Sequence, residues 1–173
     1  MRIEFKQKKP AFSLIEIIIV LFIISMGLIG ILSLIVQNIQ SQDYNRSNLI
    51  ATQLSQEGIE LIRRVRDTNF KQSNDFNYGL AEVSGVVNNY CFDYDDEGPQ
   101  ESGSACLLRI DEDGFYAHEL IGLSSGFSRL IKVELVEEGT ALKVISEVFW
   151  TGRAGNSAYI VEALLYDWYN TGI

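Results

Sequence analysis

A run of twenty residues without a charge, from Ile17 to Val36, most limits what this chain can fold into. As an α-helix, which rises about 1.5 Å per residue, the run spans roughly 30 Å, the thickness of a bilayer's hydrocarbon core. A cleaved secretory signal has an apolar region of only about 7–15 residues and then a small-x-small cleavage site. No such site follows Val36. We therefore expect a membrane-spanning helix that stays in the protein.

One carboxylate, Glu16, stands immediately before this run. An acidic side chain at the centre of a spanning helix costs about 2.5–3.5 kcal/mol on insertion scales, and less near the edge. Two interpretations stay open at this point. Either Glu16 reaches the headgroup level and is solvated there, or it has a positively charged partner that the apolar run itself does not supply.

Charge is distributed unevenly along the chain. Residues 1–11 contain Arg2, Lys6, Lys8 and Lys9 against Glu4, a net charge of +3; since the whole chain carries −9, the remainder carries −12. Positive flanks of a spanning helix stay in the cytoplasm, so we expect a cytoplasmic N-terminus and an extracytoplasmic body. The acidic body argues against direct nucleic-acid binding, which needs clustered lysine and arginine.

The stretch "KKPAFSLIEIIIVLFI", residues 8–23, resembles the class III signal of type IV prepilins and type II secretion pseudopilins. In that family a basic leader ends in a small residue, and the mature chain begins with a hydrophobic residue, commonly Phe. Here the cut falls between Ala11 and Phe12, and the family pattern is matched in order by Phe12, Ser13, Leu14, Ile15 and Glu16. The family usually has Gly before the cut, so Ala11 is a departure.

The resemblance implies how the chain is processed and assembled. Prepilin peptidase removes residues 1–11 and N-methylates the new amine of Phe12, and Glu16 faces the terminal amine of a neighbouring subunit in a filament. Implied partners are this peptidase, other pilin or pseudopilin subunits, the inner-membrane assembly platform and membrane lipid. We expect a minor subunit of a cell-surface or periplasmic filament, with no cofactor and no enzymatic activity. The alternative is a single-pass, membrane-anchored extracytoplasmic binding module.

The helix is expected to continue beyond the membrane, over residues 12–66, with residues 12–36 spanning and residues 37–66 amphipathic. Its second half carries one apolar stripe at steps of three and four residues, widened by Ile62: Ile50, Leu54, Gly58, Leu61 and Val65. Such a stripe packs against another element. Gly27 and Gly30 lower helix propensity within the apolar run.

The body, residues 67–173, shows the period-two alternation of β-strands. Expected strands cover 106–110, 115–118, 128–138, 141–151 and 158–169, and residues 83–106 are expected to be mostly loop. The inward faces are predicted to hold Ile131, Val133 and Leu135; Leu142, Val144, Val148 and Trp150; and Tyr159, Val161, Ala163 and Leu165. Asp113-Gly114 is a hairpin signal. The predicted fold is α+β: a long N-terminal helix packed on a small antiparallel sheet, as in pilins.

Few residues of the body point to chemistry. Cys91 and Cys106 are a plausible disulfide in an exported domain; without CxxC spacing or a Cys/His cluster, no metal site is predicted. The acidic run from Asp93 to Gly98 begins like a calcium loop, but Ser104 stands where the loop needs Glu, which favours a solvated loop. His118, the single histidine, has no nucleophile in a recognisable frame, so no catalytic residue is predicted.

Overall fold

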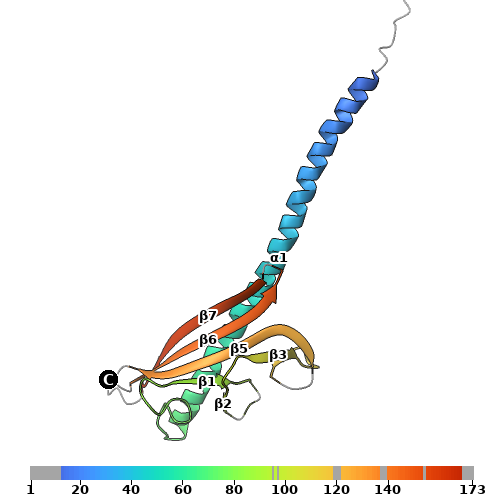
Figure 1. Cartoon of the computed structure of the whole chain (residues 1–173). Helices are drawn as coiled ribbons and strands as arrows, with labels where there is room; N and C mark the ends of the chain where they lie inside the picture. The colour runs from blue at the N-terminus through green and yellow to red at the C-terminus, as the bar shows by residue number, and fades with distance from the viewer. Residues whose placement is uncertain are drawn as a thin grey trace, which may run out of the picture. The chain divides into compact units, whose positions relative to one another are not determined.

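The computed structural model describes residues 13–94, 96, 98–118, 122–136, 140–153 and 155–168. The predicted leader and the Ala11–Phe12 cleavage site lie outside these residues. The described residues form one α-helix and a sheet of seven strands (Figure 1). They belong to two compact units that divide after Asp43, so each unit is described by itself.

Helix α1 covers Leu14–Lys71, five residues further than the sequence predicts. The extra turn is fixed by tertiary contacts: Asn69 is buried, and its side-chain amide donates to the carbonyl oxygens of Phe76, at 3.3 Å, and Tyr78, at 2.9 Å. The chain then leaves the helix at Ser73, whose φ of 59° is left-handed. Helical propensity alone does not contain this information.

In the first unit, α1 is apolar on every side. It is long and apolar enough to cross a membrane, and none of its most apolar window is buried within the chain. Leu14, Phe22 and Ile29 keep 75%, 64% and 68% of their surface exposed. A helix that is hydrophobic all round needs an apolar surrounding, which a bilayer or packed neighbouring helices provide.

Seven antiparallel strands make up the sheet of the second unit. They are β1 (Val87–Cys91), β2 (Gln100–Glu101), β3 (Cys106–Ile110), β4 (Tyr116–Ala117), β5 (Leu123–Val136), β6 (Ala141–Gly152) and β7 (Gly155–Tyr166). Along one edge β5 pairs with β6, and β6 pairs with β7. Along its other edge β5 pairs with both β1 and β3, and these two strands pair further out with β2 and β4. The prediction of an antiparallel sheet is confirmed. The last positions of two predicted strands, 137–138 and 169, lie outside the described residues.

Strand β5 organises this sheet, which is not a simple succession of hairpins. β5, β6 and β7 are three consecutive strands that pair in succession, whereas β1 with β2 and β3 with β4 form two separate pairs. Along its other edge β5 pairs first with β3, through Leu123–Arg129, and then with β1, through Ile131–Glu134. Most of residues 83–106 lie outside strands, as predicted, but the prediction did not include β1 and β2. The segment is polar and lacks a clear alternation of apolar and polar residues. Its residues Val87–Cys91 form strand β1 because β5 has an unpaired edge with which they can form hydrogen bonds.

The second half of α1 and the inward faces of the strands form the core, as predicted. Leu54, Leu61 and Ile62 of α1 are buried, and the inward residues of β5 and β6 named above are buried with them. The buried hydrophobic side chains form two clusters. One holds Ile59, Ile62, Ile131, Val133, Val144 and Phe92, and the other holds Ala51, Leu54, Leu108, Phe127, Val148 and Trp150.

A polar band separates the two clusters. It consists of Ser55, Asp93, Arg129 and Ser146, each no more than 2% exposed. On β5, Arg129 lies between Phe127 of one cluster and Ile131 of the other, and on β6, Ser146 lies between Val144 and Val148. Gly58 brings α1 close to the sheet at this level. A Cβ atom there would lie 3.2 Å from Ser146 Cβ and 3.3 Å from Ile131 Cδ1, with Ser146 Oγ closer still.

We expect Gly58→Ala to destabilise the second unit, although alanine favours a helix by about 1 kcal/mol. Overpacking of a close-packed site costs about 1–3 kcal/mol, which exceeds that gain. Ser146→Ala is the matched control, because Ser146 Oγ is buried without a hydrogen-bond partner among the described residues. That change alone should be neutral or stabilising, and added to Gly58→Ala it should restore part of the loss. Thermal unfolding measures all three; an unchanged Gly58→Ala midpoint would contradict the packing.

Candidate functional site

The first candidate site is the start of α1. The helix begins after Ser13, whose carbonyl oxygen accepts hydrogen bonds from the backbone N–H of Glu16, at 3.1 Å, and of Ile17, at 3.3 Å. Glu16 is exposed in the single chain and stands in the first turn. A carboxylate there is favoured by the positive end of the helix dipole. The predicted cleavage residues Ala11 and Phe12 are not among the described residues, so their roles stay predictions.

The second candidate site is built around the guanidinium of Arg129, which is 1% exposed. Its Nη2 donates to the carbonyl oxygen of Phe92, at 2.6 Å, and to Oδ1 of Asp93, at 2.8 Å. Its Nη1 donates to the carbonyl oxygen of Leu54, at 3.2 Å, and lies 3.3 Å from Oε1 of Glu57. One side chain thus links α1, β5 and the segment that follows β1.

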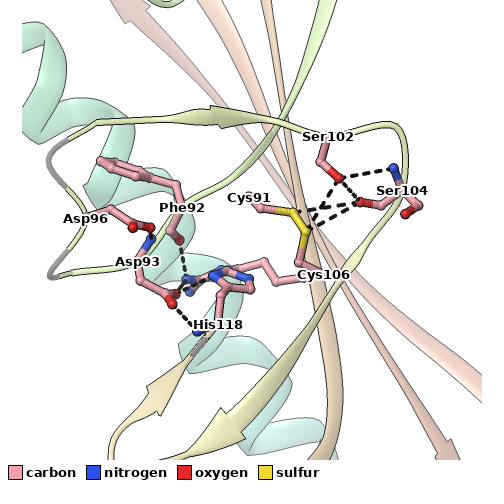
Figure 2. The surroundings of a disulfide bond; sticks show 9 residues. Cys91, Phe92, Asp93, Asp96, Ser102, Ser104, Cys106 and His118 are labelled. Atoms are coloured by element: carbon pink, nitrogen blue, oxygen red, sulfur yellow. Dashed lines mark hydrogen bonds and ion pairs between the residues drawn. A yellow bond between two sulfur atoms is a disulfide. The ribbon is translucent and has the colours of Figure 1, made fainter. Parts of the chain in front are cut away.

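Asp93 connects His118 to this cluster. Its Oδ1 lies 2.8 Å from Nδ1 of His118, and its Oδ2 accepts the backbone N–H of His118. The Nδ1 contact does not meet the geometry of a hydrogen bond. Figure 2 shows Asp93 between Phe92 and His118, turned into the protein. With Arg129 and Glu57, the site combines one permanent positive charge with two carboxylates and an imidazole.

The disulfide lies beside this cluster. Cys91 ends β1 and Cys106 begins β3, and the structure joins them with Cα atoms 5.9 Å apart, within the usual range for the disulfide that the sequence favoured. Cys106 pairs directly with Arg129 across the β3–β5 ladder. The bond therefore ties together the two short strands that share one edge of β5 (Figure 2).

The acidic run from Asp93 to Gly98 departs from the solvated loop that was predicted. Asp93 is 2% exposed and bound by Arg129. The carboxylate of Asp96 accepts the backbone N–H of Asp93, at 2.8 Å, and the side-chain amide of Gln100, at 3.2 Å. Positions 95 and 97 lie outside the described residues. Among the described residues of this run, the protein's own donors thus take carboxylate oxygens of Asp93, the first position of the calcium-loop pattern, and of Asp96.

The predicted turn at Asp113-Gly114 is confirmed as the β3–β4 connection. Gly114 has a φ of 89°, and Ile110 pairs with Tyr116 across the hairpin. A hydrogen bond from the backbone N–H of Phe115 holds the pKa of the Asp111 carboxyl below its usual value. Asp111 thus acts as a turn residue.

The role of Arg129 was missed by the sequence interpretation, although the sequence contains a signal for it. Phe127, Arg129, Ile131, Val133 and Leu135 alternate along β5, so Arg129 occupies an inward position of an otherwise apolar face. A charge in such a register must be paired when buried. Its partners could not be identified in advance, because Phe92 and Asp93 belong to a segment that was expected to be loop.

We expect Arg129→Leu to lower the free energy of unfolding by about 3–5 kcal/mol, because it leaves Asp93 buried without its cation. Adding Asp93→Asn should recover part of the loss. The matched control is Arg63→Leu on the exposed face of α1, where Arg63 Nε lies 3.4 Å from Glu60 Oε2. This exposed pair should contribute about 0–1 kcal/mol. Urea unfolding followed by tryptophan fluorescence measures the set; equal losses at Arg129 and Arg63 would contradict the cluster's role.

Comparison with known proteins identifies the N-terminal segment. Residues 6–32 match the family model described as the prokaryotic N-terminal methylation motif. No curated protein and no solved structure is significantly similar to the chain. The match joins the basic leader, the sequence around Phe12 and Glu16, and the apolar part of α1. The chain therefore carries a prepilin-type N-terminal signal of the kind found in type IV pilins and pseudopilins.

Proposed function

We propose that this chain is a structural subunit, a minor pilin or pseudopilin, of a type IV pilus or a type II secretion-like filament, and not an enzyme. The observation that carries the proposal is the methylation motif at residues 6–32, which overlaps the apolar first part of helix α1 from Leu14 onward. The motif makes the chain a substrate of prepilin peptidase. The exposed apolar surface of α1 supplies what filament subunits need to pack on one another.

Glu16 sets the register between subunits in this proposal. Cleavage before Phe12 creates a cationic α-amine four residues before Glu16 in the sequence. Once bilayer lipid is replaced by packed helices, a carboxylate without a cation nearby is costly. Only a stagger that brings the amine of one subunit to the carboxylate of its neighbour removes this cost. The pair therefore selects an arrangement more than it adds net affinity.

The body lies outside the cytoplasm in this proposal, and the basic leader stays inside. Two observations support this orientation: residues 1–11 are basic, and Cys91 and Cys106 form a disulfide, which persists in oxidising compartments. After cleavage the subunit passes from the membrane to the assembly platform, and its neighbours in the filament replace the lipid around α1.

We expect the protein extracted from native membranes to lack its first 11 residues and to begin with Phe12, carrying one methyl group on the α-amine. Intact-mass and N-terminal peptide mass spectrometry measure both features. Replacing Ala11 with Gly, the usual family residue, should leave the cleavage site unchanged and speed processing. A stably anchored protein that still begins with Met1 would instead favour a membrane-anchored binding module.

We expect Glu16→Ala and Glu16→Gln to insert into the membrane as well as the native chain and to be strongly depleted from filaments. The expected depletion is at least about tenfold, since each 1.4 kcal/mol corresponds to a factor of ten. The readout is the ratio of the protein in sheared filaments to the protein in membranes.

Asp43→Asn provides the control for this experiment. Asp43 is an exposed acid on the same helix, beyond the apolar run, and its loss should leave the ratio unchanged. The glutamine variant keeps the size of the side chain and removes its charge. If it assembled as well as the native chain, the registration role of Glu16 would be refuted even with cleavage confirmed.

A further inference from the structure

Three soft donor groups that are distant in sequence meet beside β5. The sulfur atoms of Cys91 and Cys106 and one ring nitrogen of His118 all lie within 4.8 Å of one another. The two cysteines belong to β1 and β3, and His118 directly follows β4, so three strands place the donors (Figure 2). No metal site was predicted because the spacing shows no Cys/His cluster. The sheet creates the cluster that the spacing lacks.

His118 is held as a metal-binding imidazole would be. Its Nδ1 lies 2.8 Å from the carboxylate of Asp93 without a hydrogen bond between them, which leaves Nε2 as the ring nitrogen open to a ligand. This Nε2 atom is buried and has no hydrogen-bond partner among the described residues. The side chain is only 15% exposed. Asp93 also accepts the backbone N–H of His118, so this carboxylate contacts the residue at two points.

We propose that the reduced chain binds one thiophilic divalent cation, of the Zn²⁺ class, through Cys91 Sγ, Cys106 Sγ and His118 Nε2. Two thiolates and an imidazole are the donor set that zinc prefers, and water completes a tetrahedral site. The Cα separation of 5.9 Å lets the two sulfurs move apart to a common ion without rebuilding β1 or β3. The proposal is independent of filament assembly.

A second grouping, Asp93, Asp96 and His118, also brings its donor atoms within 4.8 Å of one another, but its chemistry is less suitable. Arg129 already donates to Asp93 Oδ1, and the backbone N–H of His118 already occupies Oδ2. A cation at that place would stand beside a guanidinium that cannot lose its charge. The Asp93 carboxylate therefore serves as the support of His118 and not as a ligand.

The metal and the disulfide exclude each other, because both use the same sulfurs. Binding the cation releases the two thiol protons. Disulfide formation removes the same two protons together with two electrons, which an external disulfide accepts as it is reduced to two thiols. Each state closes the same loop of sequence separation 15 between β1 and β3. The cation would thus hold this junction together before oxidation and protect the thiols from it.

Cobalt titration of the full chain in detergent tests the site, after reduction with a phosphine under anaerobic conditions. We expect one equivalent of Co²⁺ to give a thiolate-to-cobalt charge-transfer absorption, which Zn²⁺ then displaces. The oxidised chain should give no such band. Bound Zn²⁺ should also slow reoxidation by glutathione disulfide. Far-UV circular dichroism follows the sheet throughout, and a reduced chain that binds cobalt only after losing its sheet would overturn the proposal.

Two variants identify the ligands. His118→Gln should weaken cobalt binding at least about tenfold, the scale on which even supporting residues act at such sites. Asp96→Asn, which alters the competing acidic grouping, should leave both the band and the affinity unchanged. The absence of a charge-transfer band in the reduced native chain would overturn the proposal. So would unchanged affinity in His118→Gln, which would reduce the site to two adventitious thiolates.

Discussion

The apolar surface of α1 before Gln37 is the constraint on which the rest of this protein depends. Every large hydrophobic side chain from Leu14 to Val36 is exposed in the single chain. Transferring one such side chain out of water is worth about 1.5–3 kcal/mol, so the run as a whole cannot remain in solvent. The helix needs lipid or other helices around it at every stage. The proposed function meets this requirement in two places, because lipid surrounds the helix before assembly and neighbouring helices surround it in the filament.

The second unit solves a different problem, which is how to hold short, polar strands against a long one. β5 pairs with β6 along one edge and with β3 and β1 in succession along the other. The junction of β1 and β3 is where the disulfide, the ion cluster and the backbone of α1 come together. A buried ion network adds little net stability when it is complete. Its value here lies in geometry, because Nη1 and Nη2 of Arg129 find their acceptors only with α1 and the segment after β1 in place.

Much of this fold follows from local patterns in the sequence. The helical run and stripe, the alternation of β5 to β7 and the Asp113-Gly114 turn are properties of neighbouring residues, and the structure has all three. The missing parts depend on contacts outside the element itself. β1 has weak alternation and exists because β5 has a free edge, and α1 reaches Lys71 because Asn69 finds acceptors beyond the helix.

The same distinction applies to the candidate sites: one could be identified from neighbouring residues and the other could not. The N-terminal motif is contiguous, so its residues could be identified by their order alone. Asp93, His118 and Arg129 lie on three separate segments, and spacing along the chain says nothing of their meeting. The inward register of Arg129 on β5 indicated a buried charge without naming its partners. The meeting of His118 with the two cysteines needed the strand order, which the alternation of single strands does not provide.

The central claim is that the carboxylate of Glu16 meets the terminal amine of another subunit. Zero-length carbodiimide coupling of isolated filaments tests it directly, since this reagent joins only carboxylates and amines that touch. The account predicts an inter-chain amide between Glu16 and the amine of Phe12, detected by mass spectrometry of the peptide pair. A secondary, methylated amine still forms this bond. Filaments in which Glu16 couples to no terminal amine, while other contacts are linked efficiently, would contradict the account.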